Sequence, residues 1–153
     1  MSILKIIVVT ILAFFFMEFV RKFIINNLVV YFFNFRSSNS IFVGKLIREN
    51  YLYIFNLIIL TPIVEEFVFR KAIFGCLYDL YLGCNKYVRF MTAFLISGIL
   101  FCSIHDGVFA PSSISYLFGS LIYSSLYLYS KSIIPSVVIH GLHNLVFVLM
   151  SLP

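Results

Sequence analysis

The chain is built from apolar runs, each close to the length needed to cross a bilayer. They are residues 3–20, 51–69, 90–105, 113–129 and 133–152, and the second could continue to about residue 82. A transmembrane helix needs about 20 predominantly apolar residues. A lipid-exposed span must satisfy its own backbone hydrogen bonds, which a helix does and an open strand does not. The chain therefore predicts an all-α, polytopic membrane helix bundle of about five spans.

The polar breaks between these runs suggest a division of the chain into two parts. Residues 1–50 are predicted to hold the N-terminal span and an interfacial segment at 41–50. Residues 51–153 are predicted to form the core from the last four spans. Pro62 lacks a backbone N–H and should kink the second helix. Whether residues 23–35 continue the first helix stays open at this point.

The distribution of charge favours lipid headgroups as partners rather than nucleic acid. The net charge is +5, only 11% of residues are charged, and the basic residues lie mostly between apolar runs. No basic stripe interleaved with aromatic residues follows a polar face, which argues against nucleic-acid binding. Glu18 has Arg21 three residues later, a pattern that we interpret as a solvated helix end. Abundant Phe, Tyr, Ile and Asn, with little Ala, favours a multi-pass protein of a bacterial plasma membrane.

Two adjacent acids interrupt the second apolar run. An ionised side chain at the bilayer centre costs roughly 2.5–3.5 kcal/mol on insertion scales, so Glu65 and Glu66 are functional candidates. Glu66 and Arg70 are four residues apart, share a helix face and are predicted to pair. Glu65 points about 100° away, has no local partner and is free to act as a general base. The alternative is that all three residues sit at a wet helix end.

Histidines and an amide occur in two further runs. His105 ends the third run, and His140 and Asn144 share one face in the middle of the last run. An interfacial histidine and interhelical hydrogen bonds are the alternative explanations. His143 lies about 60° away around the helix and is interpreted as the likelier bystander of the two histidines. Asp106 is interpreted as the start of a loop. The three cysteines form no C-x-x-C, so neither a disulfide framework nor a thiolate metal site is expected.

These motifs resemble one known family when they are taken in order. The motifs are Glu65-Glu66-x-x-x-Arg70, Phe101-x-x-x-His105 and His140-x-x-x-Asn144, on successive apolar runs. The set resembles the CAAX-processing and bacteriocin-processing endopeptidase family, also called type II CAAX prenyl endopeptidases or the Abi family, over about residues 60–149. Neither G-x-S-x-G nor H-E-x-x-H occurs, which disfavours a serine nucleophile and a zincin.

The resemblance implies a membrane-embedded endopeptidase, a hydrolase that works without an acyl-enzyme. Glu65 would take a proton from water and His105 would hold that water. His140 and Asn144 would donate hydrogen bonds to the oxyanion, and Glu66 and Arg70 would orient the helix. No cofactor is certain, because Glu65, His105 and His140 could ligate zinc or could activate water without a metal.

The resemblance also implies a peptide or a lipidated protein as substrate. The process could be bacteriocin or signal-peptide processing, or self-immunity. Two other functions compete with proteolysis: a non-catalytic bacteriocin-immunity or peptide-binding membrane protein, and a proton or cation conduit. We rank proteolysis first because a conduit has no need of the three ordered motifs.

Overall fold

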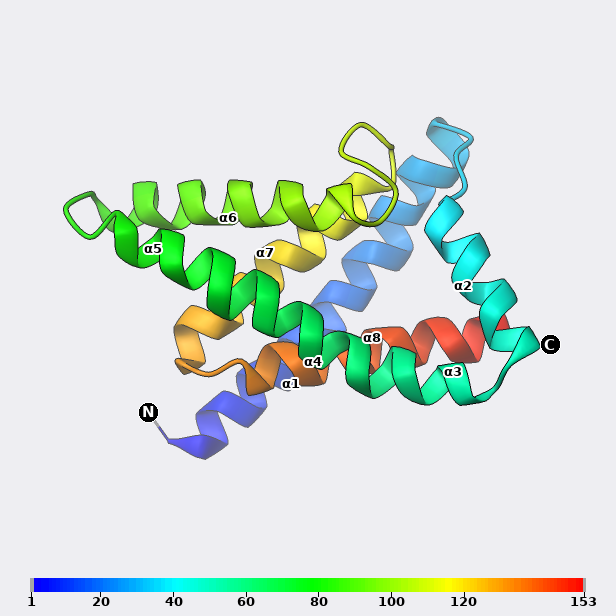
Figure 1. Cartoon of the computed structure of the whole chain (residues 1–153), viewed down its shortest axis with the longest axis horizontal. Coiled ribbons are helices and arrows are strands. Elements are labelled where there is room, and N and C mark those ends of the chain that lie inside the picture. Colours follow the sequence, from blue (N-terminus) through cyan, green and yellow to red (C-terminus); the bar gives the residue numbers. More distant parts are fainter. Residues whose placement is uncertain (1, 153) are drawn as a thin grey trace.

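A computed structural model describes residues 2–152, and every regular element in that part of the chain is helical. The elements run in one order along the chain, and several of them join end to end into longer helices (Figure 1). Their bounds are α1 Ile3–Val20, η1 Arg21–Ile25, η2 Asn27–Phe32, α2 Ser38–Glu49, α3 Leu52–Phe55, η3 Asn56–Leu60, α4 Thr61–Glu66, η4 Phe67–Gly75, α5 Cys76–Leu80, α6 Lys86–Ser103, α7 Ser113–Ser130 and α8 Ile134–Ser151. The η elements are π-helical turns.

Four helices within residues 2–152 are long and apolar enough to cross a membrane. They are Ile3–Phe32, Leu52–Leu80, Lys86–Ser103 and Ile134–Ser151. The predicted all-α membrane bundle is confirmed. The sequence suggested about five spans, and the difference is α7, whose many serines and tyrosines lower its hydropathy although it has the same length as α6 and α8.

The first helix is longer than its first apolar run. Residues 21–25 and 27–32 continue it as π-helical turns to Phe32, which answers the question left open for residues 23–35. Glu18 therefore lies inside a 30-residue helix, and the interpretation of a solvated helix end was wrong. The side chain of Glu18 is 17% exposed.

The helix that carries the two acids bends where its hydrogen bonding changes. Figure 1 shows the segment from α3 to α5 changing direction near α4. Pro62 stands in the first turn of α4, directly after the π-helical turns of η3, and a second π-helical segment, η4, follows Glu66. π-Helical turns are frequent at functional sites and leave carbonyl groups open to other donors. The kink predicted at Pro62 thus lies beside the acids.

Small residues let the core helices approach closely. A Cβ on Gly141 of α8 would lie 2.7 Å from the carbonyl oxygen of Ile58 in η3, closer than such atoms pack. Ser97 of α6 is fully buried and donates a hydrogen bond of 2.8 Å to the carbonyl of Phe69 in η4. Interfaces rich in Gly and Ser are typical of membrane bundles. These contacts hold α6 and α8 against the acid-bearing helix.

The turn after α6 is tied to the start of α2. The helix ends at Ser103, so His105 lies just beyond the helix rather than within it as the 90–105 run suggested. Asp106 accepts hydrogen bonds from the backbone of Asn39, from Ser112 and from Tyr116. Asp106 does begin the loop after α6, as expected, and in addition it ties this loop to α2 and α7. The division at residue 50 stays a prediction.

Candidate active site

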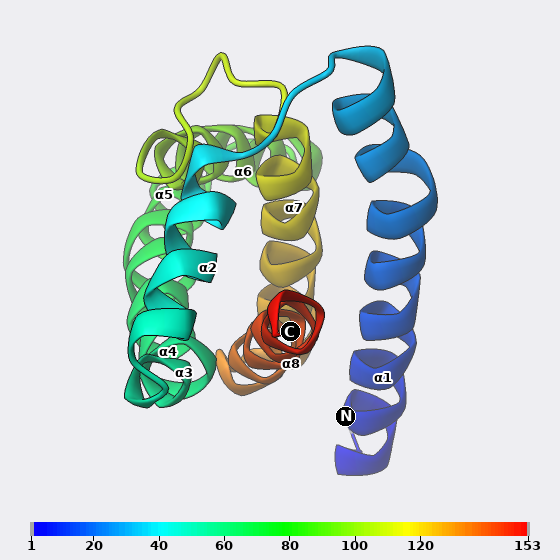
Figure 2. The ribbon, with the colours of Figure 1, turned by 90° about the vertical axis from the view of Figure 1, so that its right-hand side faces the viewer.

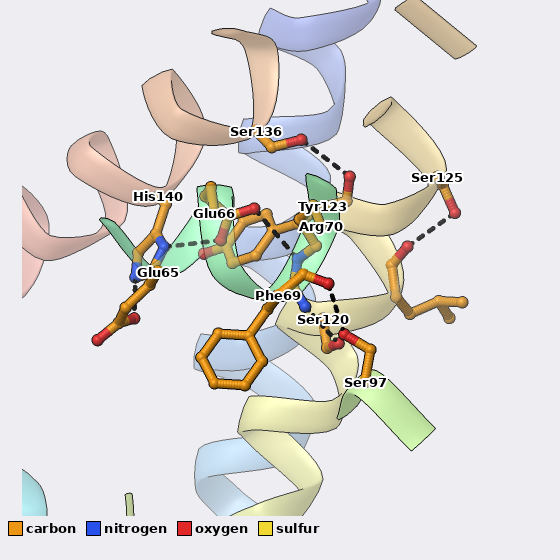
Figure 3. Close-up of polar contacts among 11 residues, drawn as sticks. Glu65, Glu66, Phe69, Arg70, Ser97, Ser120, Tyr123, Ser125, Ser136 and His140 are labelled. Atoms are coloured by element: carbon orange, nitrogen blue, oxygen red, sulfur yellow. Dashed lines mark hydrogen bonds and ion pairs between the residues drawn. The ribbon is translucent and has the colours of Figure 1, made fainter. Parts of the chain in front are cut away.

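The buried centre of the site is Glu66, which holds two partners at once. Its Oε2 accepts a hydrogen bond of 3.1 Å from Arg70 Nε, and its Oε1 lies 2.9 Å from His140 Nδ1 (Figure 3). The side chains of Glu66 and Arg70 are both 0% exposed. The predicted ion pair is confirmed, and the structure extends it to a third residue that is 74 positions away in the chain.

Aromatic rings enclose this charged network. The guanidinium of Arg70 lies 5.0 Å from the ring centre of Phe101 and 5.4 Å from that of Tyr123. The ring of His140 stacks on Tyr123 at 5.1 Å with planes 15° apart. Arg70 Nη1 also donates to Ser120 Oγ at 3.1 Å. Cation–π contacts and a tight ion pair together offset the burial of a charge that would otherwise be unfavourable.

Glu65 has a different environment although it is the next residue. Its side chain is 17% exposed, and its Oε2 is buried without a hydrogen-bond partner among the described residues. That oxygen lies 3.6 Å from His140 Nε2 (Figure 3). A step of one residue, about 100° around the helix, thus gives Glu66 a complete set of partners and leaves Glu65 with acceptor capacity to spare.

His105 is held in one orientation by its own turn. Its Nδ1 lies 2.7 Å from the carbonyl oxygen of Phe101, and its ring packs at 4.5 Å against the rings of Phe101 and Tyr116. A carbonyl oxygen only accepts, so Nδ1 carries the proton of this bond. In the neutral ring, Nε2 is then an acceptor.

Asn144 faces the acid-bearing helix from α8. Its Nδ2 donates a 2.9 Å hydrogen bond to the carbonyl of Leu57 in η3. The amide has a second N–H and a carbonyl oxygen that this bond does not use. Gly141, one turn earlier, lets the two backbones approach closely enough for this contact.

The predicted catalytic side chains line one cavity of about 190 Å³. Glu65 comes from α4, His105 from the turn after α6, and His140 and Asn144 from α8. Glu66 and Arg70 do not line this space. Because one water occupies about 30 Å³ in the liquid, this central cavity has room for water together with a reacting group.

The described residues do not form a metal site as they stand. Within residues 2–152, no group of three His, Cys, Asp or Glu side chains lies close enough together to ligate one ion. His140 Nδ1 bonds Glu66 and His105 Nδ1 bonds a backbone carbonyl, which leaves the Nε2 atom of each ring for another ligand. Zinc ligation by Glu65, His105 and His140 therefore stays a prediction.

One polar cluster beside the cavity escaped the sequence reasoning. His143 Nδ1 bonds Glu18 Oε1, and Glu18 Oε2 accepts from Arg21 at 2.8 Å. His143 and Arg21 both line the central cavity, so the spacing that set His143 apart from His140 did not show that it lies beside the site. An acid inside the long apolar run 3–20 was the available signal, since intramembrane charges seek interior partners.

Comparison with known proteins gives a family and two relatives. The model of a family described as type II CAAX prenyl endopeptidase Rce1-like matches residues 47–146. The chain is 36% identical over 98 residues to the membrane-embedded CAAX protease MroQ of Staphylococcus aureus (strain USA300), and 37% identical over 87 residues to the UPF0177 protein YxdF of Lactococcus lactis subsp. lactis (strain IL1403). These matches cover 63% and 57% of this chain, but only 38% and 43% of the two relatives. No solved structure matches the chain.

Proposed function

The chain belongs to the type II CAAX prenyl endopeptidase family, Rce1-like, and we propose that it hydrolyses a peptide bond of a small peptide or lipidated protein in the membrane. The observation that carries this proposal is the single cavity that Glu65, His105, His140 and Asn144 line together. The relative in Staphylococcus aureus is named a membrane-embedded CAAX protease, which supports the same reaction class. The resemblance noted above leaves bacteriocin and signal peptides as candidate substrates.

The proposed nucleophile is a water held between Glu65 and His105. The water donates one hydrogen to Glu65, whose Oε2 has no other hydrogen-bond partner in the described chain. It donates the other hydrogen to His105 Nε2, the acceptor left by the bond between Nδ1 and Phe101. As the water oxygen attacks the scissile carbonyl, its proton passes to Glu65. General base catalysis of this kind contributes typically 10²–10⁴-fold.

The proposed oxyanion site uses two donors on α8. His140 keeps Nδ1 on Glu66 and presents Nε2 to the developing oxyanion. Asn144 donates with the N–H that does not bond Leu57. Each such donor is worth about 2.7–4 kcal/mol in comparable tests. When the C–N bond breaks, the amine leaves with the proton held by Glu65, so the proton balance closes.

Glu66 and Arg70 are proposed as positioning residues. Glu66 receives both Arg70 and His140, and this fixes the ring on which the oxyanion depends. The role is supported by their complete burial and their absence from the cavity lining. They are expected to act through His140 and not by touching the substrate.

The test is peptide cleavage by the full chain in lipid nanodiscs. Glu65→Gln, His105→Ala, His140→Ala and Asn144→Ala should each lower kcat by about 10²-fold or more, with normal accumulation in membranes. His140→Ala also removes a partner of Glu66, so its folding has to be checked by gel filtration. Full cleavage by Glu65→Gln would refute the proposed mechanism. Peptide binding without cleavage by the wild-type chain would favour a peptide-binding protein that does not cleave.

A further inference from the structure

A second cavity, of about 630 Å³, adjoins the central cavity and is lined by three arginines. It lies between the second half of the first helix, α2 and the end of α8, and we call it the basic groove. Figure 2 shows the segment that joins η2 to α2 crossing over between these elements. Two walls of the groove belong largely to residues 21–44, outside the part of the chain that the family model matches.

The basic groove and the central cavity share part of their walls. Six residues line both spaces: Arg21, Ser40, Ser115, Tyr116, His143 and Phe147. A ligand that fills the groove therefore lies beside the space in which Glu65 and His140 meet. An extended peptide could occupy both at once, which is why the occupant is better sought in the substrate than in a separate ligand.

The charge of the groove is positive and only partly neutralised. Arg21, Arg36 and Arg48 line it, and no Asp or Glu does among the described lining residues. Glu18 pairs with Arg21 from outside the lining. Neither Arg36 nor Arg48 has a carboxylate within 4.0 Å in the described chain, so the surplus positive charge falls on these two.

The local structure directs these arginines to the groove. Arg36 stands in the short connection between η2 and α2, and Arg48 lies in the last turn of α2. A Cβ built on Gly44 would lie 3.7 Å from Arg48 Nη1, so this guanidinium runs back along α2 over a residue without a side chain. Arg21 Nε is buried without a hydrogen-bond partner among residues 2–152, a donor that a ligand at the junction of the two spaces could use.

We propose that the basic groove binds acidic side chains, or a terminal carboxylate, of the peptide whose bond is cleaved in the central cavity. The inference rests on the proposed function and adds to it a substrate class, a peptide with negative charge close to the scissile bond. Apolar groove residues such as Ile25, Val29 and Phe147 would contact the intervening side chains. Guanidinium groups suit this role because they bind carboxylates with two parallel hydrogen bonds.

Binding is measured first, so that this inference can be judged apart from catalysis. The full chain carrying Glu65→Gln is placed in nanodiscs of phosphatidylcholine. Three fluorescent peptides share the same length and apolar residues, and their polar positions are all Glu, all Gln or all Lys. Anisotropy should show the Glu peptide binding tightest, with the preference shrinking as salt is raised, because exposed charges are screened within about 8 Å at 0.15 M.

Matched variants locate the effect. Arg36→Gln and Arg48→Gln should each weaken binding of the Glu peptide by about two- to five-fold, the range expected of exposed ion pairs. Lys22→Gln and Lys45→Gln remove the same charge from the same region but line neither space, and should leave affinity unchanged. Equal affinity for the Glu and Gln peptides would overturn the proposal, as would equal losses in the lysine variants.

A lipid headgroup is the competing source of negative charge. If Arg36→Gln and Arg48→Gln reduce phosphatidylglycerol binding while the ratio of Glu- to Gln-peptide affinity stays the same, the groove is a lipid site and the proposal fails. Cleavage by the wild-type chain is scored separately. A Glu peptide that binds through the arginines while no peptide is cleaved would sink the endopeptidase mechanism and leave the acidic-peptide site standing.

Discussion

Replacing each of the two adjacent glutamates by glutamine should have contrasting effects on the stability of the fold. Glu65→Gln should abolish cleavage and leave the fold almost as stable as before. Glu66→Gln should destabilise the fold severely, and its loss of activity should follow from that and from the displaced His140. The two substitutions change the same atoms one residue apart, so the contrast depends only on the surroundings of each side chain.

The magnitudes follow from the contacts. Glu66 and Arg70 are 0% exposed and 3.1 Å apart, and removing one partner of a buried pair leaves an uncompensated charge, which costs about 3–5 kcal/mol. A glutamine N–H₂ would also face the donors Arg70 Nε or His140 Nδ1. Glu65 Oε2 has no hydrogen-bond partner in the described chain and a single contact of 3.6 Å, so its change should cost about 1 kcal/mol or less.

The assay is unfolding of the purified full chain in detergent, during titration with a denaturing detergent. Unfolding is monitored by the circular dichroism of the helices, because the chain has no tryptophan whose fluorescence could be used. Glu49→Gln is the matched control, because Glu49 pairs with Lys45 at 3.6 Å on an exposed surface. It should change the free energy of unfolding by less than about 1 kcal/mol. Cleavage is measured on the same preparations.

Non-additivity provides the second arm of this test. Glu66→Gln combined with Arg70→Met removes both charges and should be less destabilising than the sum of the single changes. The division of roles is refuted if Glu65→Gln unfolds the chain as readily as Glu66→Gln. It is also refuted if Glu66→Gln keeps full stability, since Arg70 would then have another source of compensation.

Two further predictions concern the walls of the site. Gly141→Ala should destabilise the fold by about 1–3 kcal/mol in thermal unfolding and lower cleavage, because its Cβ would meet the Ile58 carbonyl at 2.7 Å. Gly119→Ala, whose Cβ would have ordinary contacts, should not destabilise the fold. Burial raises the pKa of Asp106, but hydrogen bonds from Ser37, Asn39, Ser112 and Tyr116 outweigh it and leave that pKa below the usual 3.8. Asp106 should therefore stabilise the fold at pH above about 4 and lose this contribution as the pH falls through its folded pKa. The difference in Tm between wild type and Asp106→Asn should then shrink in acid. A difference in Tm that stays constant with pH would contradict this role of Asp106.

The sequence was sufficient wherever the physical cause is local. Apolar runs of span length dictate helices in a membrane because an unpaired backbone cannot be left in lipid. The four-residue spacing of Glu66 and Arg70 dictated their pairing, and that of His140 and Asn144 their common face. The same reasoning left Glu65 unpaired and free to act as a general base, since the sequence places no cationic residue on its face of the helix.

Contacts between distant segments could be decided only by the tertiary structure. His140 meets Glu66 across 74 positions, and His143 meets Glu18 across 125. Periodicity places a residue on a face but does not say which helix that face meets. Gly141 of α8 and the π-helical turns of η3 determine how these two helices pack, because they decide how closely the two backbones approach and which carbonyls stay free. Glu65 and Glu66 were evident from the sequence, whereas the basic groove of Arg21, Arg36 and Arg48 became evident only from the packing of three distant segments.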